Sequence, residues 1–386
     1  MMKFHTTILA LLMLLQSLSL IFCGNSHCFT GSDLSLVDPD ATKETQAVFF
    51  NLRRLAKNKL LIGHQNSTDY GIGWKNEDNR SDVRSVTGSY PAVYGWDMAA
   101  MDNPRLPKLI KESHARGGIN TISWHMKNPV TGGPFSDTTE AVKHILHKGQ
   151  NHEKFKRTLD RFVTFLGDLK DDNDHPIPLI FRPWHENTGD WFWWGTKSCT
   201  APEFIELWQF TVKYLRDTKN VHNLLYAYSP SQTGIRDKRN YLTNRFPGEE
   251  YMDIIGIDHY YHEDPQALIS QLRIVVTLAE EKNKIPALTE TGVAQGLGRT
   301  DIGGWFTMAF LEPIKRDPVA RRVAYALFWR NARTEHFWVP YPGHRNAPDF
   351  KKLYDDPFTV FEDNLPDVYS LPMKNDPNWN GGCDNK

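Results

Sequence analysis

The fold is decided by segments such as IPLIFRPWHE, residues Ile177–Glu186. The segment begins as an apolar run and ends in polar and aromatic residues. An unbroken apolar run of this length is expected of a strand that is buried on both faces, as in a parallel sheet covered by helices. Seven other segments of the chain follow the same pattern.

Together these segments form a regular series of eight predicted strands. Longer amphipathic stretches separate them, and residues 42–57, 153–169, 202–216, 266–282 and 305–315 have helical periodicity. The alternation predicts βα units and a parallel sheet. Eight units, with no Gly-rich phosphate loop, favour a single-domain (β/α)8 (TIM) barrel over a doubly wound open sheet. The predicted strands are Lys59–Gln65, Pro91–Asp97, Gly118–His125, Ile177–Glu186, Leu224–Ser229, Asp253–Tyr260, Ile285–Thr291 and Val323–Trp329.

Polar or aromatic residues end every predicted strand. Examples are Trp124-His125, His185-Glu186 and Trp329-Arg330. Catalytic groups of (β/α)8 barrels lie at the carboxyl ends of the strands, where the βα loops converge. The pattern therefore predicts an active site at that end of the barrel.

The N-terminus has the features of a signal peptide. Lys3 supplies a positive charge, the apolar run Ile8–Phe22 is short for a membrane span, and small polar residues follow it. We expect residues 1–25 to be removed, which leaves residues 26–386 as the catalytic domain of a secreted or periplasmic protein without a transmembrane segment. Lipid attachment at Cys23 is an alternative, although Phe22 fits poorly before such a site.

Composition excludes several function classes. The formal net charge of −1 argues against nucleic acid as a partner. The four cysteines match no zinc pattern, although one disulfide is permitted in an oxidising compartment. No His follows Glu186 at the spacing of a zinc protease, and no G-x-S-x-G elbow is present. We expect no metal and no cofactor, and we interpret the protein as a monomer. A metal-like cluster by composition, His259, His262, Glu263 and Asp264, is interpreted as part of a solvated loop.

Tryptophan is the most informative residue type. The chain has 12 Trp, and the stretch Trp191–Trp194 places four aromatic residues in a row in the loop that follows Glu186. We interpret this loop as a platform for a flat ligand, since sugars pack their C–H faces on aromatic rings.

Two glutamates complete the predicted site. Glu186 ends the fourth strand and Glu290 ends the seventh, so the two are roughly opposite each other across the barrel mouth. Such a pair can flank one glycosidic bond, with one carboxyl protonating the leaving oxygen and the other attacking or stabilising the anomeric carbon. Different surroundings must then separate the two pKa values.

These segments resemble glycoside hydrolase family 26, best known for β-mannanases. The resemblance rests on Trp184-His185-Glu186 with Trp191–Gly195, and on Thr289–Gly292. Further matches, in family order over residues 40 to 350, are Gly63–Gln65, Pro91–Asp97, Trp124-His125 with Asn128-Pro129, Ile255–Tyr260 and Phe328–Arg330.

The resemblance implies residue roles and a substrate. It implies that Glu186 is the acid/base and Glu290 the nucleophile of a retaining hydrolase acting on β-1,4-mannan, glucomannan or galactomannan. His185 would position Glu186 and contact the sugar, and Tyr260 would donate a hydrogen bond to Glu290. The other predicted substrate contacts are His125, Trp124, Arg182, Trp191 and Trp329.

Two alternatives remain open from the sequence. One is a β-1,3-1,4-glucanase or xylanase of the same family. The other is a non-catalytic barrel that binds polysaccharide, which would have no need for both carboxylates. Endo and exo action also stay undecided, since they depend on how the loop Met126–His152 shapes the cleft.

Overall fold

Residues 34–299 and 302–371 are described by a computed structural model of the chain, in which Ser35–Leu371 forms one compact unit. The predicted signal segment and Cys23, Cys28 and Cys383 lie outside the described residues. Cys199, the described cysteine, is a buried free thiol. In this part of the chain no helix has the length and apolar character needed to cross a membrane.

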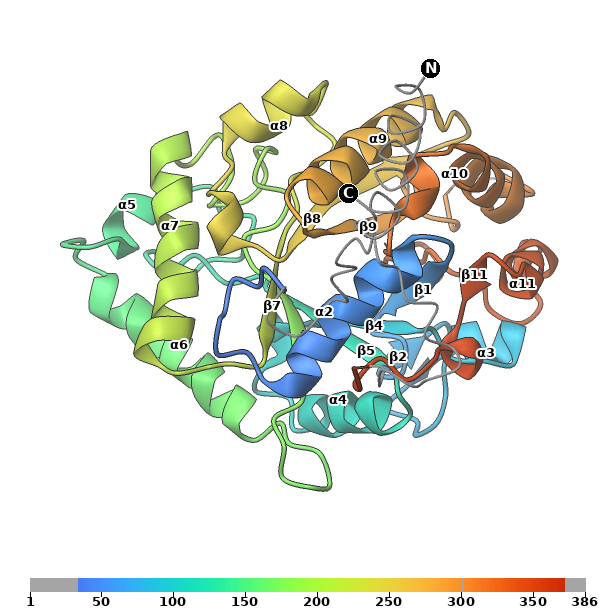
Figure 1. Ribbon diagram of the computed structural model, residues 1–386, viewed down its shortest axis with the longest axis horizontal. Coiled ribbons are helices and arrows are strands. Elements are labelled where there is room, and N and C mark those ends of the chain that lie inside the picture. Colours follow the sequence, from blue (N-terminus) through green and yellow to red (C-terminus); the bar gives the residue numbers. More distant parts are fainter. Residues whose placement is uncertain (1–33, 300–301, 372–386) are drawn as a thin grey trace, which may run out of the picture. The chain divides into compact units, whose positions relative to one another are not determined.

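Eight parallel strands close into a barrel. Their order is β10-β9-β8-β7-β6-β5-β4-β1, and β10 pairs with β1 to complete the circle (Figure 1). Each corresponds to one predicted strand, so the predicted (β/α)8 barrel is confirmed. The bounds are β1 (Leu60–Gln65), β4 (Val93–Asp97), β5 (Ile119–Ser123), β6 (Leu179–Arg182), β7 (Leu224–Tyr228), β8 (Ile254–Tyr261), β9 (Ile285–Val293) and β10 (Tyr325–Phe328).

Helices surround the strands and bury their outer faces (Figure 1). All five predicted helical stretches are helical, although 214–218 and 305–311 are wider π-helical turns. The α-helices are α2 (Lys43–Ala56), α3 (Asp82–Thr87), α4 (Arg105–Ala115), α5 (Val142–Ile145), α6 (His152–Gly167), α7 (Ala201–Lys213), α8 (Lys238–Asn244), α9 (Gln266–Glu281), α10 (Glu312–Arg316) and α11 (Ala347–Asp355).

Local sequence explains where several helices begin. The side chain of Thr42 caps α2, and Thr200 with Glu203 forms a reciprocal capping box at α7. The apolar stripes of these helices then pack on the barrel, where most of the core lies.

Three short strands lie outside the barrel circle. β2 (Tyr70–Gly71) and β3 (Trp74–Lys75) form a small antiparallel hairpin in the loop after β1. β11 (Thr359–Val360) pairs with Leu60 and Leu61, the first residues of β1. The hairpin therefore belongs to the carboxyl-end loops, whereas β11 lies at the opposite end of the barrel.

Candidate active site

The chain leaves strand β6 in an uncommon conformation. Trp184 and Glu186 have φ values of 50° and 52°, in the left-handed region, where a non-glycine residue pays about 1–2 kcal/mol. The buried Trp184 ring, whose Nε1 donates to Thr211 Oγ1 (3.1 Å), and the bond from Glu186 N to Ser229 O (2.8 Å) hold this backbone in place. Such strain is concentrated at functional sites, where it aims a side chain.

The tryptophan loop after Glu186 is mostly core. Trp193 and Trp194 are 0% exposed, and their indole N–H groups donate to Met126 O (2.8 Å) and His185 O (2.7 Å). Phe192 is also buried, and its ring stacks on Trp194 at 4.5 Å between centroids. The interpretation of all four aromatics as a ligand platform is therefore wrong. The buried rings instead make the loop rigid.

Trp191 is the exposed member of this loop. Its ring is 38% exposed, and its Nε1 donates to Glu186 Oε2 at 2.8 Å. The ring lies so close to Gly189 that a Cβ there would come within 2.4 Å of an indole carbon. Gly189 is thus needed for Trp191 to reach Glu186, and the loop presents one aromatic ring beside one carboxyl group.

Glu290 projects from β9 into a network of buried polar groups. Arg182 donates through its two terminal nitrogens to Glu290 Oε2 and Asp258 Oδ2, both at 2.6 Å. Tyr260 donates to Glu290 Oε1 at 2.5 Å, as the family resemblance implies. Burial and the charge of Glu290 raise the pKa of Tyr260 well above its ordinary value, so its hydroxyl keeps the proton that it donates.

Glu186 has a different environment. Burial, together with the nearby charges of Glu290 and Asp258, raises the pKa of Glu186 well above its ordinary value. The Trp191 hydrogen bond and the charge of Arg182 act in the opposite direction without cancelling this effect. A carboxyl group with a raised pKa holds its proton to higher pH, as a general acid requires.

Two histidines lie beside the carboxyl groups. His125 Nδ1 is 2.7 Å from Asp97 Oδ2, and His125 Nε2 is 3.2 Å from His185 Nε2. Burial, followed by the charges of Arg182 and His125, lowers the pKa of His185 well below its ordinary value. His185 is therefore neutral, and the residue before Glu186 is linked to Asp97 through His125.

Aromatic rings surround His125. The ring of Trp329, at the end of β10, lies 5.8 Å from it, and that of Phe135 lies 4.7 Å from it. Phe135 comes from the long loop after β5 and is 37% exposed. These rings and Trp191 provide apolar surfaces beside the carboxyl groups, which suits the C–H faces of a sugar.

Two predicted substrate contacts, Trp124 and Arg182, are buried among protein groups. Trp124 is 3% exposed and packs against Phe162 of α6 in the core, so its position does not support contact with substrate. Arg182 is 1% exposed and bonds to Asp258, Glu290 and Ser229. Its guanidinium is occupied by protein carboxylates, and it orients Glu290 instead of meeting a ligand.

The sequence-based site omitted Asp97, Asp258 and Phe135. Asp97 ends β4 and Asp258 lies in the carboxyl-terminal half of β8, and these positions were the available signal. Their partners across the barrel were not apparent from the sequence. Phe135 lies within a loop whose path depends on tertiary contacts, and no pattern in the sequence marked it.

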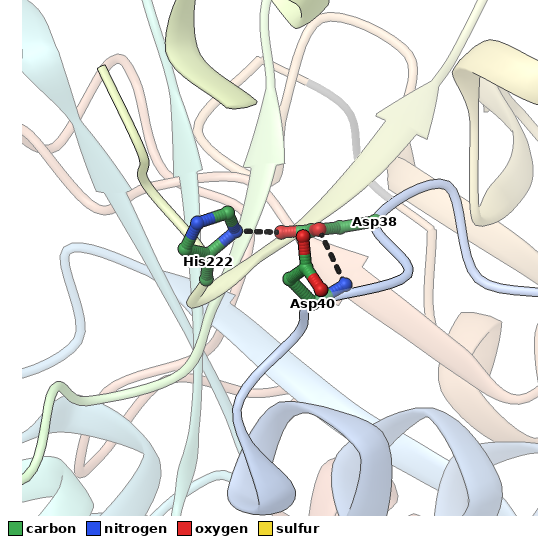
Figure 2. Close-up of side chains that lie close together, drawn as sticks. All are labelled: Asp38, Asp40 and His222. Atoms are coloured by element: carbon green, nitrogen blue, oxygen red, sulfur yellow. Dashed lines mark hydrogen bonds and ion pairs between the residues drawn. The ribbon is translucent and has the colours of Figure 1, made fainter. Parts of the chain in front are cut away.

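One group of three possible metal ligands occurs among the described residues, and it is remote from this site. Asp38, Asp40 and His222 approach one another before α2 and before β7, at the amino end of that strand (Figure 2). Asp38 accepts from His222 Nδ1 (2.8 Å) and from the backbone N–H of Asp40 (2.9 Å). These bonds account for the cluster without an ion. His262, Glu263 and Asp264 are exposed, as expected of a solvated loop, whereas His259 is buried and bonded to Gln271 (2.6 Å).

Two glutamates in different surroundings and exposed aromatic rings at the carboxyl end of a (β/α)8 barrel are the features of a glycoside hydrolase site. Comparison with known sequences assigns the family. The sequence model of glycosyl hydrolase family 26 matches residues 37–313, and the chain belongs to that family.

Relatives in sequence and structure agree with this assignment. The chain is 34% identical over 357 residues to a mannan endo-1,4-β-mannosidase of Bifidobacterium adolescentis, a match that covers 84% of the chain and 35% of that protein. The chain thus spans about a third of that relative's length. A double mutant of Cellulomonas fimi endo-β-1,4-mannanase superposes with a TM-score of 0.83 at 37% identity, covering 88% of this chain and 80% of that one. A family 26 β-mannanase of Bacteroides ovatus gives 0.79 at 38% identity, covering 86% and 98%.

Proposed function

We propose that the protein is a retaining endo-β-1,4-mannanase in which Glu186 is the acid/base and Glu290 the nucleophile. The observation that carries the proposal is the contrast between the two carboxyl groups. Glu186 has a raised pKa and one hydrogen bond from Trp191, whereas Glu290 is paired with Arg182 and bonded by Tyr260. The family relatives named as mannanases supply the substrate.

In the first step, Glu290 attacks the anomeric carbon and the bond from that carbon to the leaving oxygen breaks. The proton of Glu186 passes to the leaving oxygen, so the departing sugar leaves as a neutral alcohol. The hydrogen bonds from Arg182 and Tyr260 fix the direction of attack. Near-attack geometry held by such bonds lowers the barrier, because the orienting entropy is lost before the reaction.

In the second step, water replaces the leaving sugar. Glu186, now ionised, takes a proton from the water as its oxygen attacks the anomeric carbon, and the ester bond to Glu290 breaks. While Glu290 is bound to the sugar it carries no charge, which favours the ionised form of Glu186. When the ester bond breaks, the charge of Glu290 returns and again raises the pKa of Glu186. Two inversions at one carbon retain the β configuration.

A panel of polymers tests the substrate. We expect release of short oligosaccharides from mannan, galactomannan and glucomannan, and no comparable release from mixed-linkage glucan or xylan. Activity on glucan or xylan alone supports the alternative of a glucanase or xylanase. Binding without turnover of any polymer supports a non-catalytic barrel. A Glu186→Gln and Glu290→Gln double variant is the control for contaminating hydrolases.

Stereochemistry tests the mechanism independently of the polymer. Retention requires that the two carboxyl groups lie about 5–5.5 Å apart in the working enzyme. Proton NMR of the first product before mutarotation is expected to show the β anomer. An initial α anomer contradicts double displacement.

We also propose that the protein acts outside the cytoplasm. The charged start and apolar run of residues 1–25 support export, and a polymeric substrate requires it. N-terminal sequencing of the secreted protein tests this, and recovery of the intact N-terminus from the cytoplasm contradicts it.

A further inference from the structure

Asp97, at the end of β4, bonds to a residue beside the carboxyl pair without itself belonging to that pair. Its Oδ1 accepts from the backbone N–H groups of His125 (3.1 Å) and Ala99 (2.9 Å). Its Oδ2 lies 2.7 Å from His125 Nδ1. Both carboxylate oxygens of Asp97 therefore have hydrogen-bond partners, and two of the three hydrogen bonds are with His125.

We propose that Asp97 is a positioning residue, which fixes the tautomer of His125 and through it the hydrogen bonding of His185 beside Glu186. The proposal deepens the proposed function and rests on it for the effect on turnover. Its structural part, the control of the His125 tautomer, stands on the contacts alone.

The carboxylate decides which nitrogen of His125 carries a proton. Burial acts to raise the pKa of Asp97, but its contact with the His125 side chain and the hydrogen bonds from the backbone N–H groups of Ala99 and His125 outweigh it and lower the pKa. Asp97 is therefore ionised, and an ionised carboxylate only accepts hydrogen bonds. It follows that His125 Nδ1 carries a proton, and that Nε2 faces His185.

Packing cannot supply this control. The rings of His185, Phe135, Phe192 and Trp329 surround His125 at centroid distances of 4.6 to 5.8 Å and hold its plane. The two neutral tautomers of imidazole have nearly the same shape, so these ring contacts do not distinguish them. A hydrogen-bond partner at one nitrogen does.

The effect reaches His185 through a single contact. The two Nε2 atoms lie 3.2 Å apart, and one of them must supply the hydrogen. His185 Nδ1 has no partner among the described residues, and its side chain is buried. The protonation of His125 therefore sets which nitrogen of the buried His185 ring, in the residue before Glu186, carries a hydrogen.

The substitution Asp97→Asn reverses this arrangement. An amide side chain has one accepting oxygen, and two backbone N–H groups point at the Oδ1 position. The amide oxygen is held there, so the NH2 group faces His125 Nδ1. A donor in that place requires a bare Nδ1, and the proton of His125 moves to Nε2.

The matched control is the second Asp–His pair of the chain. Asp38 and His222 have the same Nδ1-to-carboxylate contact (2.8 Å), but they lie at the amino end of β7, away from the carboxyl-end site (Figure 2). Asp38→Asn makes the same chemical change and is expected to leave turnover of mannan-derived oligosaccharide unchanged.

The experiment combines a double-mutant cycle with NMR of histidine-labelled protein. We expect Asp97→Asn to lower kcat/KM about 10- to 100-fold, taking as a guide the cost of losing a carboxylate that orients a metal-bound histidine. In a His125→Ala background the same substitution is expected to cost less than about twofold, because the residue through which it acts is gone. Nitrogen shifts of His125 are expected to show a protonated Nδ1 in the wild type and a bare Nδ1 in Asp97→Asn.

Three results overturn the proposal. They are a bare Nδ1 in the wild type, an unchanged tautomer in Asp97→Asn, and an equal loss of kcat/KM from Asp97→Asn with and without His125. The wild-type spectrum needs no variant, so it decides the matter even where Asp97→Asn does not fold. If the wild type hydrolyses no mannan, the proposed function fails, while the NMR result still decides the role of Asp97.

Discussion

Removal of the Arg182 guanidinium probes the network that holds Glu290. Arg182 is 1% exposed and donates to two buried carboxylates, those of Asp258 and Glu290, at 2.6 Å each. A hydrogen bond to a charged group contributes about 1.5–3 kcal/mol, so two give about 3–6 kcal/mol. Proton uptake by the carboxylates relieves part of this loss. We therefore expect Arg182→Met to lower the free energy of unfolding by about 3–5 kcal/mol, the range found when one partner of a buried ion pair is removed.

The assay is urea unfolding at neutral pH, with a double-mutant cycle against Asp258→Asn. The double variant removes one of the two stranded carboxylates, so it should be more stable than the sum of the single effects predicts by at least about 1.5 kcal/mol. Arg161→Met is the matched control, since Arg161 pairs with Asp102 at 2.6 Å on the surface. Such exposed pairs contribute about 0–1 kcal/mol. Strict additivity in the cycle, or a loss in Arg182→Met no larger than in Arg161→Met, refutes the reasoning.

Three further predictions concern the tryptophans. Trp191→Phe keeps an aromatic ring but removes the N–H that favours the ionised form of Glu186, so the pKa of Glu186 should rise. Because a general acid must be protonated, the alkaline limb of the pH profile of kcat/KM should move to higher pH; a shift to lower pH contradicts the assignment. Gly189→Ala should lower kcat/KM about tenfold or more with a near-normal melting temperature, because the new Cβ displaces the Trp191 ring; wild-type kinetics would show that this close approach does not matter. Trp124→Ala should cost about 3–5 kcal/mol of stability, as for other buried aromatic residues, whereas Trp191→Ala should cost less than about 1 kcal/mol and mainly raise KM; calorimetry and kinetics of the two variants separate these outcomes.

The barrel could be predicted because its strands are buried on both faces. Each of the eight apolar runs became a barrel strand, and the polar residues that follow them gathered at one end, as for Glu186 and Glu290. Local pattern and global topology agree in such a fold, so periodicity and order along the chain were sufficient.

The tryptophan loop could not be predicted in the same way. Sequence shows that Trp191 and Trp193 are close along the chain, but not that one is exposed and the other fully buried. The difference arises because Trp193 Nε1 reaches Met126 O, in a loop 67 residues away. Partners of this kind satisfy the indole N–H groups and allow tryptophan to be buried in a loop.

The hydrogen bonds between side chains of different barrel strands could not be predicted from the sequence either. Asp97 and Asp258 were visible as polar residues at or near the carboxyl ends of strands, yet their bonds to His125 and Arg182 depend on strand neighbours and side-chain directions. Arg182 was named among the predicted substrate contacts. Two nearby carboxylates bind its guanidinium instead.

The central claim is that Glu186 and Glu290 have different roles in a two-step reaction. An aryl β-mannobioside tests it most directly, because an activated leaving group needs little protonation. Glu186→Ala should accumulate a glycosyl-enzyme, visible as an adduct by intact-protein mass spectrometry, and azide should restore turnover with formation of a β-glycosyl azide. Glu290→Ala should form no adduct, since it lacks the attacking group. An adduct on Glu290→Ala but not on Glu186→Ala reverses the roles, and wild-type activity in both variants contradicts the account of the site.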